Sequence, residues 1–157
     1  MKCIACGGRM KRTRGDYAYA SLPGTTLSNV EIYRCPACGE EEVSIPHIEE
    51  LNRTIARELV RKKTQLAPAE IRFLRKLLGW SGVDFANHFG VTPETVSRWE
   101  SGKKPMGPVA ERLLRLCIAT RAPVQNYDLE NLRGVAEDGE AATMTLKTSR
   151  SGWKAVA

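Results

Sequence analysis

Four cysteines near the amino terminus have the spacing of a metal site: Cys3 with Cys6, and Cys35 with Cys38. Each pair forms a Cys-x-x-Cys motif followed by glycine, which lets both sulfurs reach one ion and frees backbone N–H groups to donate to thiolates. Four soft ligands favour one structural zinc ion per chain, with rubredoxin-like iron and a disulfide or redox dithiol as alternatives. Because four cysteines fill a tetrahedral site, we expect no catalysis by the metal.

A stretch in the middle of the chain, SGVDFANHFGVTPETVSRWESGKK, predicts two short helices around a tight turn. Ala86 is small enough for the second helix to pass close by, and Gly90 can take the left-handed conformation that ends the first. Thr92 suits the N-cap position, with proline following it. The second helix places Val96 and Trp99 on one arc, which packs, and presents the opposite arc. The alternative is a helical hairpin that binds no ligand.

The presented arc carries side chains that can read DNA. Arg98 has the planar fork that pairs with guanine O6 and N7, and Glu94, one turn earlier, can accept from cytosine N4. The alternative for Arg98 is a phosphate contact or a salt bridge to Glu94. The predicted base-reading residues are Glu94, Thr95, Ser97 and Arg98, and the predicted contacts to the DNA backbone are Thr92, Lys103 and Lys104.

The charge of the chain favours a polyanionic partner. The net charge is +6 over 157 residues, and residues 61–104 hold nine Lys or Arg against four Asp or Glu. Phosphate contacts supply most non-specific affinity for nucleic acid, so a basic excess centred on the predicted DNA-reading helix fits that role. The Arg61-Lys62-Lys63 run is expected to be solvated or to touch phosphate.

Composition and motifs exclude several other classes. No apolar run approaches the ~18 residues of a membrane-spanning helix, and the start, MKCIACGG, lacks the apolar core of a signal peptide. We therefore expect a cytoplasmic protein with no membrane partner. His47 and His88 have no supporting motif for a nucleophile or base, so we expect no enzyme. His47 is interpreted as a surface or capping residue, since four cysteines already complete a metal site.

Two kinds of element must position these residues. Strand-like text at 16–22, 29–34 and 42–45 predicts a small sheet beside the cysteines, whose core is too small to fold without the metal. Apolar residues spaced by three and four predict a helix from 46 to 63. We expect this helix to pack between two modules, with a dimer contact as the alternative.

Helices are also predicted on both sides of the DNA-reading pair. One begins at Pro68, and the last runs from 108 to 120. The apolar residues expected on one side of the last helix are Val109, Leu113, Leu116 and Cys117. Glu100 is interpreted as a structural acid. Beyond 121 the sequence predicts a linker, with a hairpin as an option formed by 143–146 and 153–156.

The DNA-reading stretch resembles a known family. Ala86, Gly90, Val96 and the run TVSRWESGKKP are similar to the helix-turn-helix of phage-repressor-like (Cro-type, xenobiotic-response-element) regulators, over about 68–120. With the paired cysteines around a β-rich insert ahead of it, nearly the whole chain resembles the MqsA (YgiT-type zinc finger) antitoxin family. Members often carry an amide where this chain has Glu94, which leaves the operator sequence open.

The resemblance implies a fold class and a function. The fold is α+β: a small β-rich zinc-finger domain with four cysteine ligands (1–45), a linking helix (46–66), an all-α helix-turn-helix domain (67–121), and a linker with tail (122–157). The zinc domain would neutralise a small, basic toxin, often a ribonuclease. The helix-turn-helix domain would repress its own operon as a homodimer on a palindromic operator in double-stranded DNA. The alternative is a zinc-containing transcriptional regulator without a toxin.

Overall fold

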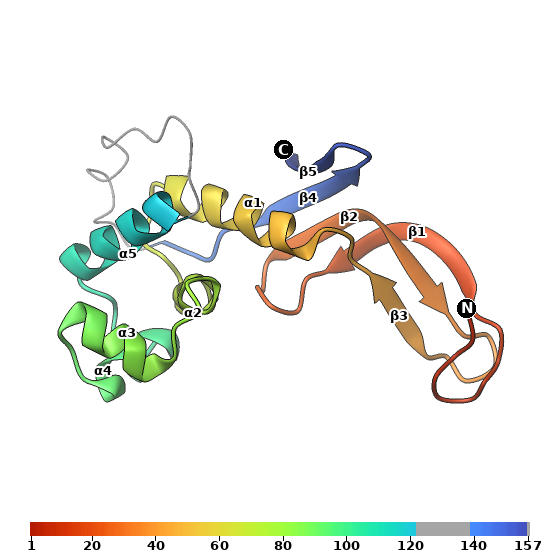
Figure 1. The fold of residues 1–157 in the computed structure, drawn as a ribbon, viewed down its shortest axis with the longest axis horizontal. Helices are drawn as coiled ribbons and strands as arrows, with labels where there is room; N and C mark the ends of the chain where they lie inside the picture. Colours follow the sequence, from red (N-terminus) through yellow and green to blue (C-terminus); the bar gives the residue numbers. More distant parts are fainter. Residues whose placement is uncertain (122–138, 157) are drawn as a thin grey trace.

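The computed structural model describes residues 1–121 and 139–156. Within these residues the chain forms three strands, five helices and two further strands, in that order. The fold is therefore mixed, with one β-sheet at one end and a group of helices at the other (Figure 1). None of the described helices combines the length and the apolar character needed to cross a membrane.

The first three strands are β1 (Lys11–Ala18), β2 (Thr25–Arg34) and β3 (Glu41–Ser44). β2 pairs antiparallel with both β1 and β3. Gly24 turns the chain between β1 and β2 at φ +84, a conformation that strains any residue with a Cβ. β1 starts earlier than predicted. Its first four residues are charged or polar and exposed, and composition therefore did not indicate a strand there.

The last two strands, β4 (Met144–Ser149) and β5 (Gly152–Val156), form the optional hairpin of the sequence analysis. Its position was not predicted. β4 pairs in parallel with β2, next to β3, so that Leu146 lies opposite Leu27 and the strand order is β1-β2-β4-β5. Parallel strands need a long crossover, and here the crossover contains all five helices.

Helix α1 (Ile48–Arg61) joins the sheet to the other helices. It starts at Ile48 because His47 is in the left-handed conformation at φ 51 and acts as the N-cap without a side-chain hydrogen bond. The buried face of α1 includes Leu51 and Ile55, both 0% exposed. These residues belong to one continuous core that runs from the sheet, including Leu146 of β4, into the remaining helices.

The remaining helices are α2 (Pro68–Leu77), α3 (Gly82–Phe89), α4 (Pro93–Glu100) and α5 (Pro108–Arg121). The buried face of α5 was not predicted from the sequence. Leu114 and Ile118 are buried, together with the charged Glu111 and Arg115. The apolar residues predicted on one side of the helix are more exposed: Val109 is 77% exposed, Leu116 45% and Leu113 39%, and Cys117 is half-buried against the core.

The buried charges of α5 explain this difference. Arg115 is 0% exposed and donates to the Glu111 carboxylate (Nη2–Oε1 2.8 Å) and to the backbone oxygens of Val60 (3.1 Å) and Thr64 (2.7 Å). The same Glu111 carboxylate accepts from the N–H of Leu66 at 3.0 Å. Burial of charge is tolerated when every polar atom is satisfied, and this network turns α5 toward the segment that follows α1.

Glu70 of α2 forms a second buried node, 1% exposed. Its carboxylate accepts from Lys62 Nζ (3.0 Å), from the N–H of Ala67 (2.7 Å) and from the N–H of Ala142 (2.7 Å). Lys62 also donates to the backbone oxygen of Glu140 at 2.8 Å. The expectation that Lys62 is solvated is therefore wrong, and this node ties α1, α2 and the segment leading to β4 together.

A candidate metal centre and a candidate nucleic-acid interface

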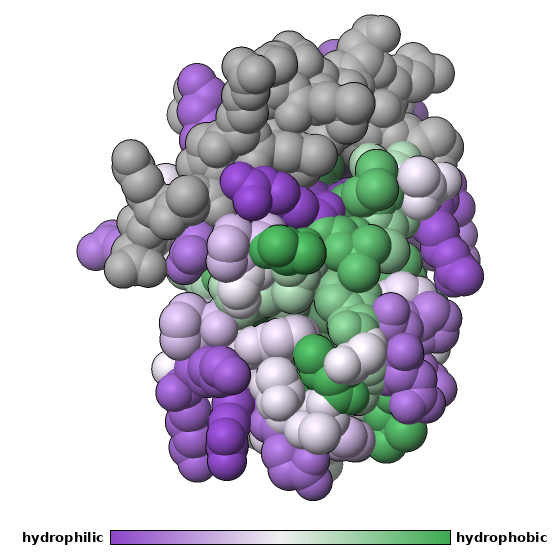
Figure 2. Space-filling model, turned by 90° about the vertical axis from the view of Figure 1, so that its left-hand side faces the viewer, coloured by the Kyte–Doolittle hydropathy of each residue, from purple (hydrophilic) through white to green (hydrophobic). Residues whose placement is uncertain are grey.

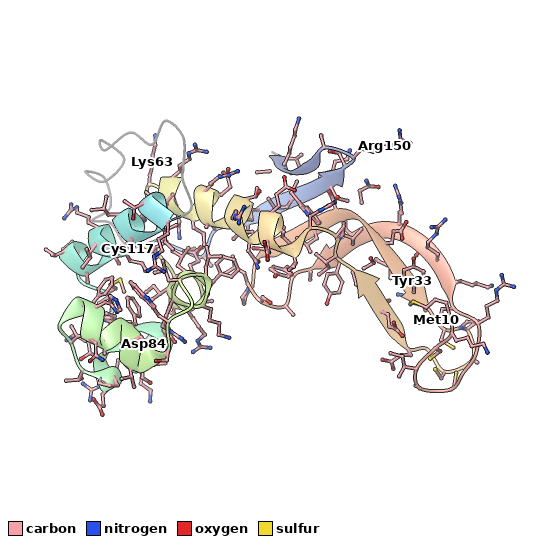
Figure 3. The ribbon with its side chains drawn as sticks, viewed as in Figure 1. Met10, Tyr33, Lys63, Asp84, Cys117 and Arg150 are labelled. Carbon is pink, nitrogen blue, oxygen red and sulfur yellow. The ribbon has the colours of Figure 1, made fainter. Side chains whose placement is uncertain are left out.

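The two Cys-x-x-Cys motifs form matching backbone turns beyond one end of the sheet. In each, the glycine after the second cysteine donates its N–H to the carbonyl of the first cysteine, at 2.9 Å from both Gly7 and Gly39. Both glycines have positive φ, +72 and +79, which is why glycine follows each pair. The matching turns aim all four sulfurs at one point, and Figure 3 shows sulfur atoms gathered near Met10 at that end.

The sulfur positions suit a single metal ion. The four Sγ atoms of Cys3, Cys6, Cys35 and Cys38 lie within 4.8 Å of one another, with Cys6 and Cys35 3.4 Å apart and Cys3 and Cys38 3.6 Å apart. A tetrahedral ion with sulfur ligands at about 2.3 Å requires sulfurs about 3.8 Å apart. The cluster therefore fits a structural metal ion, and all four positions are taken by protein ligands.

The electrostatics of the thiols also call for a cation. Backbone N–H groups, first that of Cys38, donate to the Cys35 sulfur and lower the pKa of Cys35 to about 7. The N–H of Glu40 favours the Cys38 thiolate in the same way, but the neighbouring thiols, first that of Cys6, raise the pKa of Cys38 to about 12. Four thiolates cannot gather here without positive charge, which a divalent ion supplies.

Gly8 is a site residue that the sequence analysis missed. A Cβ at this position would lie 3.2 Å from the sulfur of Cys6 and 3.3 Å from that of Cys35. A side chain would therefore press on two ligands at once. The available signal was the second glycine in Cys-Gly-Gly, which has no counterpart after Cys38, where glutamate follows the glycine.

The local structure of the predicted helix pair is confirmed. Ser81 and Asp84 form a reciprocal capping box at the start of α3, at 3.1 and 2.8 Å. Gly90 ends α3 in the left-handed conformation, at φ 64. Thr92 then caps α4 by accepting from the N–H of Thr95 at 3.2 Å. Each residue type is thus explained by the backbone group that it satisfies.

Helix α4 is fixed on its inner side by three residues. Val96 and Trp99 are 2% and 5% exposed, and the Glu100 side chain is 9% exposed. Glu100 accepts from Arg75 Nη2 (3.1 Å) and Arg72 Nε (3.3 Å) of α2, so its structural role holds α4 to α2. The opposite side of α4 is therefore presented in a fixed orientation.

The predicted DNA contacts lie on that opposite side or next to it. Glu94, Ser97 and Arg98 are exposed, and no ion pair joins Glu94 to Arg98 in the described part of the chain. The pKa of Glu94 is lowered by its own backbone N–H, by the Thr92 hydroxyl and by Arg98, so Glu94 is ionised at neutral pH. Of the others, Thr95 is half-buried, whereas Thr92, Lys103 and Lys104 are exposed.

Apolar side chains also gather on this end of the molecule. Figure 2 shows hydrophobic residues in the middle of the face, with hydrophilic residues around them. The large exposed hydrophobic residues on the helices of this end are Val83, Val109, Leu113 and Leu116. Three of them, Val109, Leu113 and Leu116, lie on α5, spaced by four and three residues along one side of the helix.

Comparison with known proteins gives one finding. The family model described as the antitoxin component of bacterial toxin-antitoxin systems, MqsA, matches residues 1–123. A search of curated proteins returns no match.

Proposed function

The chain belongs to the MqsA family of antitoxin components of bacterial toxin-antitoxin systems, and we propose that it neutralises a small protein toxin and represses its own operon. In this proposal residues 1–45 form a zinc-finger domain, 46–66 the linking helix and 67–121 the helix-turn-helix domain. The zinc ion is held by Cys3, Cys6, Cys35 and Cys38. It builds the fold and takes no part in chemistry, because no coordination position is left for a substrate.

The observation that carries the repressor role is the orientation of α4. Its inner side is held by Val96, Trp99 and the Glu100–Arg75 contact, so the outer side enters a major groove as a rigid unit. Arg98 and Glu94 then face base edges, with Thr95 and Ser97 beside them. Lys103 and Lys104, in the loop after α4, lie where a phosphate backbone would pass, and Thr92 caps the helix that meets it.

The apolar face of α5 supports a homodimer. A single recognition helix reads only a few bases, and two copies related by a two-fold axis place their recognition helices about 34 Å apart on a palindromic operator. Val109, Leu113 and Leu116 offer a self-complementary strip for such a contact. We therefore expect the dimer contact on α5 and not on α1, because the apolar face of α1 is buried in the core.

The test compares Arg98→Ala with Lys103→Ala on duplex DNA from upstream of the gene and on a scrambled duplex. Loss of a bidentate base contact should lower the preference for the natural sequence by about 1–3 kcal/mol. Loss of Lys103 should weaken both duplexes alike and lower the salt slope by about one. Equal loss of preference in both variants would contradict the assignment of α4 as the recognition helix.

The toxin-binding role is tested by size-exclusion chromatography of the purified chain mixed with the purified small protein that is encoded beside its gene. A stable complex is the expected result. If no neighbouring small protein exists or binds, the chain is a zinc-containing regulator without a toxin.

A further inference from the structure

The β4–β5 hairpin lies outside the residues that the family model matches, and it has a distinct charge. Residues 141–156 contain Lys147, Arg150 and Lys154 but no aspartate or glutamate. All three cations are exposed. No salt bridge to any of them is formed within the described residues. The hairpin's own charged residues are therefore all positive, and the Glu50 carboxylate of α1 lies against its Gly152.

Strand register places two of these cations together on the outer face of the hairpin. Leu146 and Trp153 are 0% and 5% exposed and point into the core. Lys147, the neighbour of Leu146, therefore points outward, directly opposite Lys154 on β5. Like charges in directly opposed positions repel. An anionic partner on this face would relieve that repulsion.

The positive surface continues onto β1. Arg12 and Arg14 lie on the same outer face and are paired with Glu31 of β2, at 3.4 and 3.3 Å. The outer face also holds the carboxylates of Asp16 and Glu42. Like Glu31, they lie on β1–β3, and the hairpin itself carries no carboxylate. The excess of positive charge is thus concentrated on β4 and β5.

A hollow marks where a partner would seat. A cavity of about 420 Å³ opens between the β2–β3 strands, the start of α1 and the β4–β5 turn. Arg14 of β1 and Arg150 of the β4–β5 turn line it, with the hydroxyls of Ser44 and Ser149 and the Glu31 carboxylate that pairs with Arg14 at 3.3 Å. A carboxylate entering this hollow would meet the Arg150 guanidinium and two hydroxyl donors, while Arg14 balances Glu31.

We propose that the outer face of the β4–β5 hairpin, defined by Lys147, Arg150 and Lys154, docks an acidic surface of the protein toxin. The proposal rests on the proposed function and names the chemistry of the toxin's contact surface. It differs from the basic toxin that the family resemblance implied. Arg150 and the α3 residue Asp84 lie on opposite sides of the molecule in Figure 3, so a duplex held by α4 would not cover the hairpin.

An apolar strip beside the cations favours a protein over a nucleic acid as the partner. A second hollow runs along the outer face between Ala18 of β1 and Val156 of β5, with threonine side chains between them, whereas Met144 is on the inner side with Leu146. Val156 is 41% exposed. Apolar side chains bordered by cations are typical of protein interfaces, whereas phosphate-backbone sites need only cations.

The test measures association of the full-length chain with the small protein encoded beside its gene. The double variant Lys147→Glu/Lys154→Glu should lower the association rate roughly 10-fold in low salt, and the difference should shrink at high ionic strength. The matched control is Lys103→Glu/Lys104→Glu, which should leave this rate unchanged but weaken binding to duplex DNA. The hairpin variant should bind duplex DNA like the wild type.

Each other outcome has a defined meaning. If the wild-type chain binds its neighbour and the hairpin variant binds equally fast, the docking surface is elsewhere and only this inference fails. If the hairpin variant loses DNA binding as the control does, the hairpin contacts nucleic acid and the inference is overturned. If the wild-type chain does not bind the neighbouring protein, the proposed function fails and this inference falls with it.

Discussion

Trp153 of β5 tests whether the C-terminal hairpin belongs to the core. Its side chain is 5% exposed, lies on the inner face of β5 beside α1, and donates Nε1–H to the backbone oxygen of Pro46 at 2.9 Å. Replacing a buried tryptophan by alanine costs about 3–5 kcal/mol. Part of that cost, about 1 kcal/mol, is the lost hydrogen bond.

The expected result for Trp153→Ala is a fall of about 3–5 kcal/mol in the free energy of unfolding. For a chain of this length, roughly 2–4 °C per kcal/mol gives a melting temperature lower by roughly 6–20 °C. Urea unfolding followed by far-UV circular dichroism is the assay, because it reports on the helices and does not use tryptophan emission. Trp153→Phe keeps most of the packing and should lose only about 1–2 kcal/mol.

Lys154→Ala is the matched control, since this neighbour is exposed and should change stability by less than about 0.5 kcal/mol. The continuous core predicts that Trp153→Ala destabilises the helices along with the sheet. A change below about 1 kcal/mol would refute this reasoning. So would a variant whose strands are lost while the helices unfold as in the wild type, because the hairpin would then be a separate, weakly docked unit.

Two further predictions concern the metal ligands and the start of α3. Elemental analysis should find one zinc ion per wild-type chain. The Gly8→Ala variant should hold less zinc, because its new Cβ meets two ligand sulfurs at 3.2 and 3.3 Å. The control Gly107→Ala, which has no atom within 4 Å of its new Cβ, should retain the zinc. The pKa of Asp84 is lowered from 3.8 in the folded chain, first by its hydrogen bond with Ser81. The Asp84 carboxylate therefore stabilises the fold above pH about 4, and it loses that effect as the pH falls through its folded pKa. The melting temperature of Asp84→Asn should therefore vary less with pH across that range than the melting temperature of the wild type. A wild-type pH profile that matches the variant would contradict the capping argument.

The caps and the cysteine turns could be predicted because local chemistry determines them. Gly90 and Thr92 satisfy backbone groups within four residues of themselves, and each cysteine pair is a local loop. Such features are encoded in short windows of sequence. The burial of Val96 and Trp99 could also be predicted, because their spacing of three residues places both on one side of α4.

The rest depended on contacts between distant residues. Apolar spacing grouped Val109, Leu113 and Leu116 on one side of α5, whereas the structure buries Arg115 because carbonyl groups 51 and 55 residues away complete its hydrogen bonds. Lys62 appeared in a basic run, and only its distance to Glu70 in the folded chain explains its burial. The docking of β4 on β2 has no local signature either, because periodicity identifies a strand but not its partner.

The parallel pairing of β2 with β4 has a consequence for biosynthesis. The Asn29 side chain donates to the backbone oxygen of Thr148, a contact between residues 119 positions apart. At about 5–20 residues per second, a ribosome needs roughly 6–24 s to make the intervening chain. During that time the nascent β2 is paired with β1 on one edge, but it has no strand beside Thr25–Ser28 on the edge that β4 later occupies. Newly made chains therefore pass through a stage in which this strand edge is open to proteases and chaperones, and any chain released early remains in that stage.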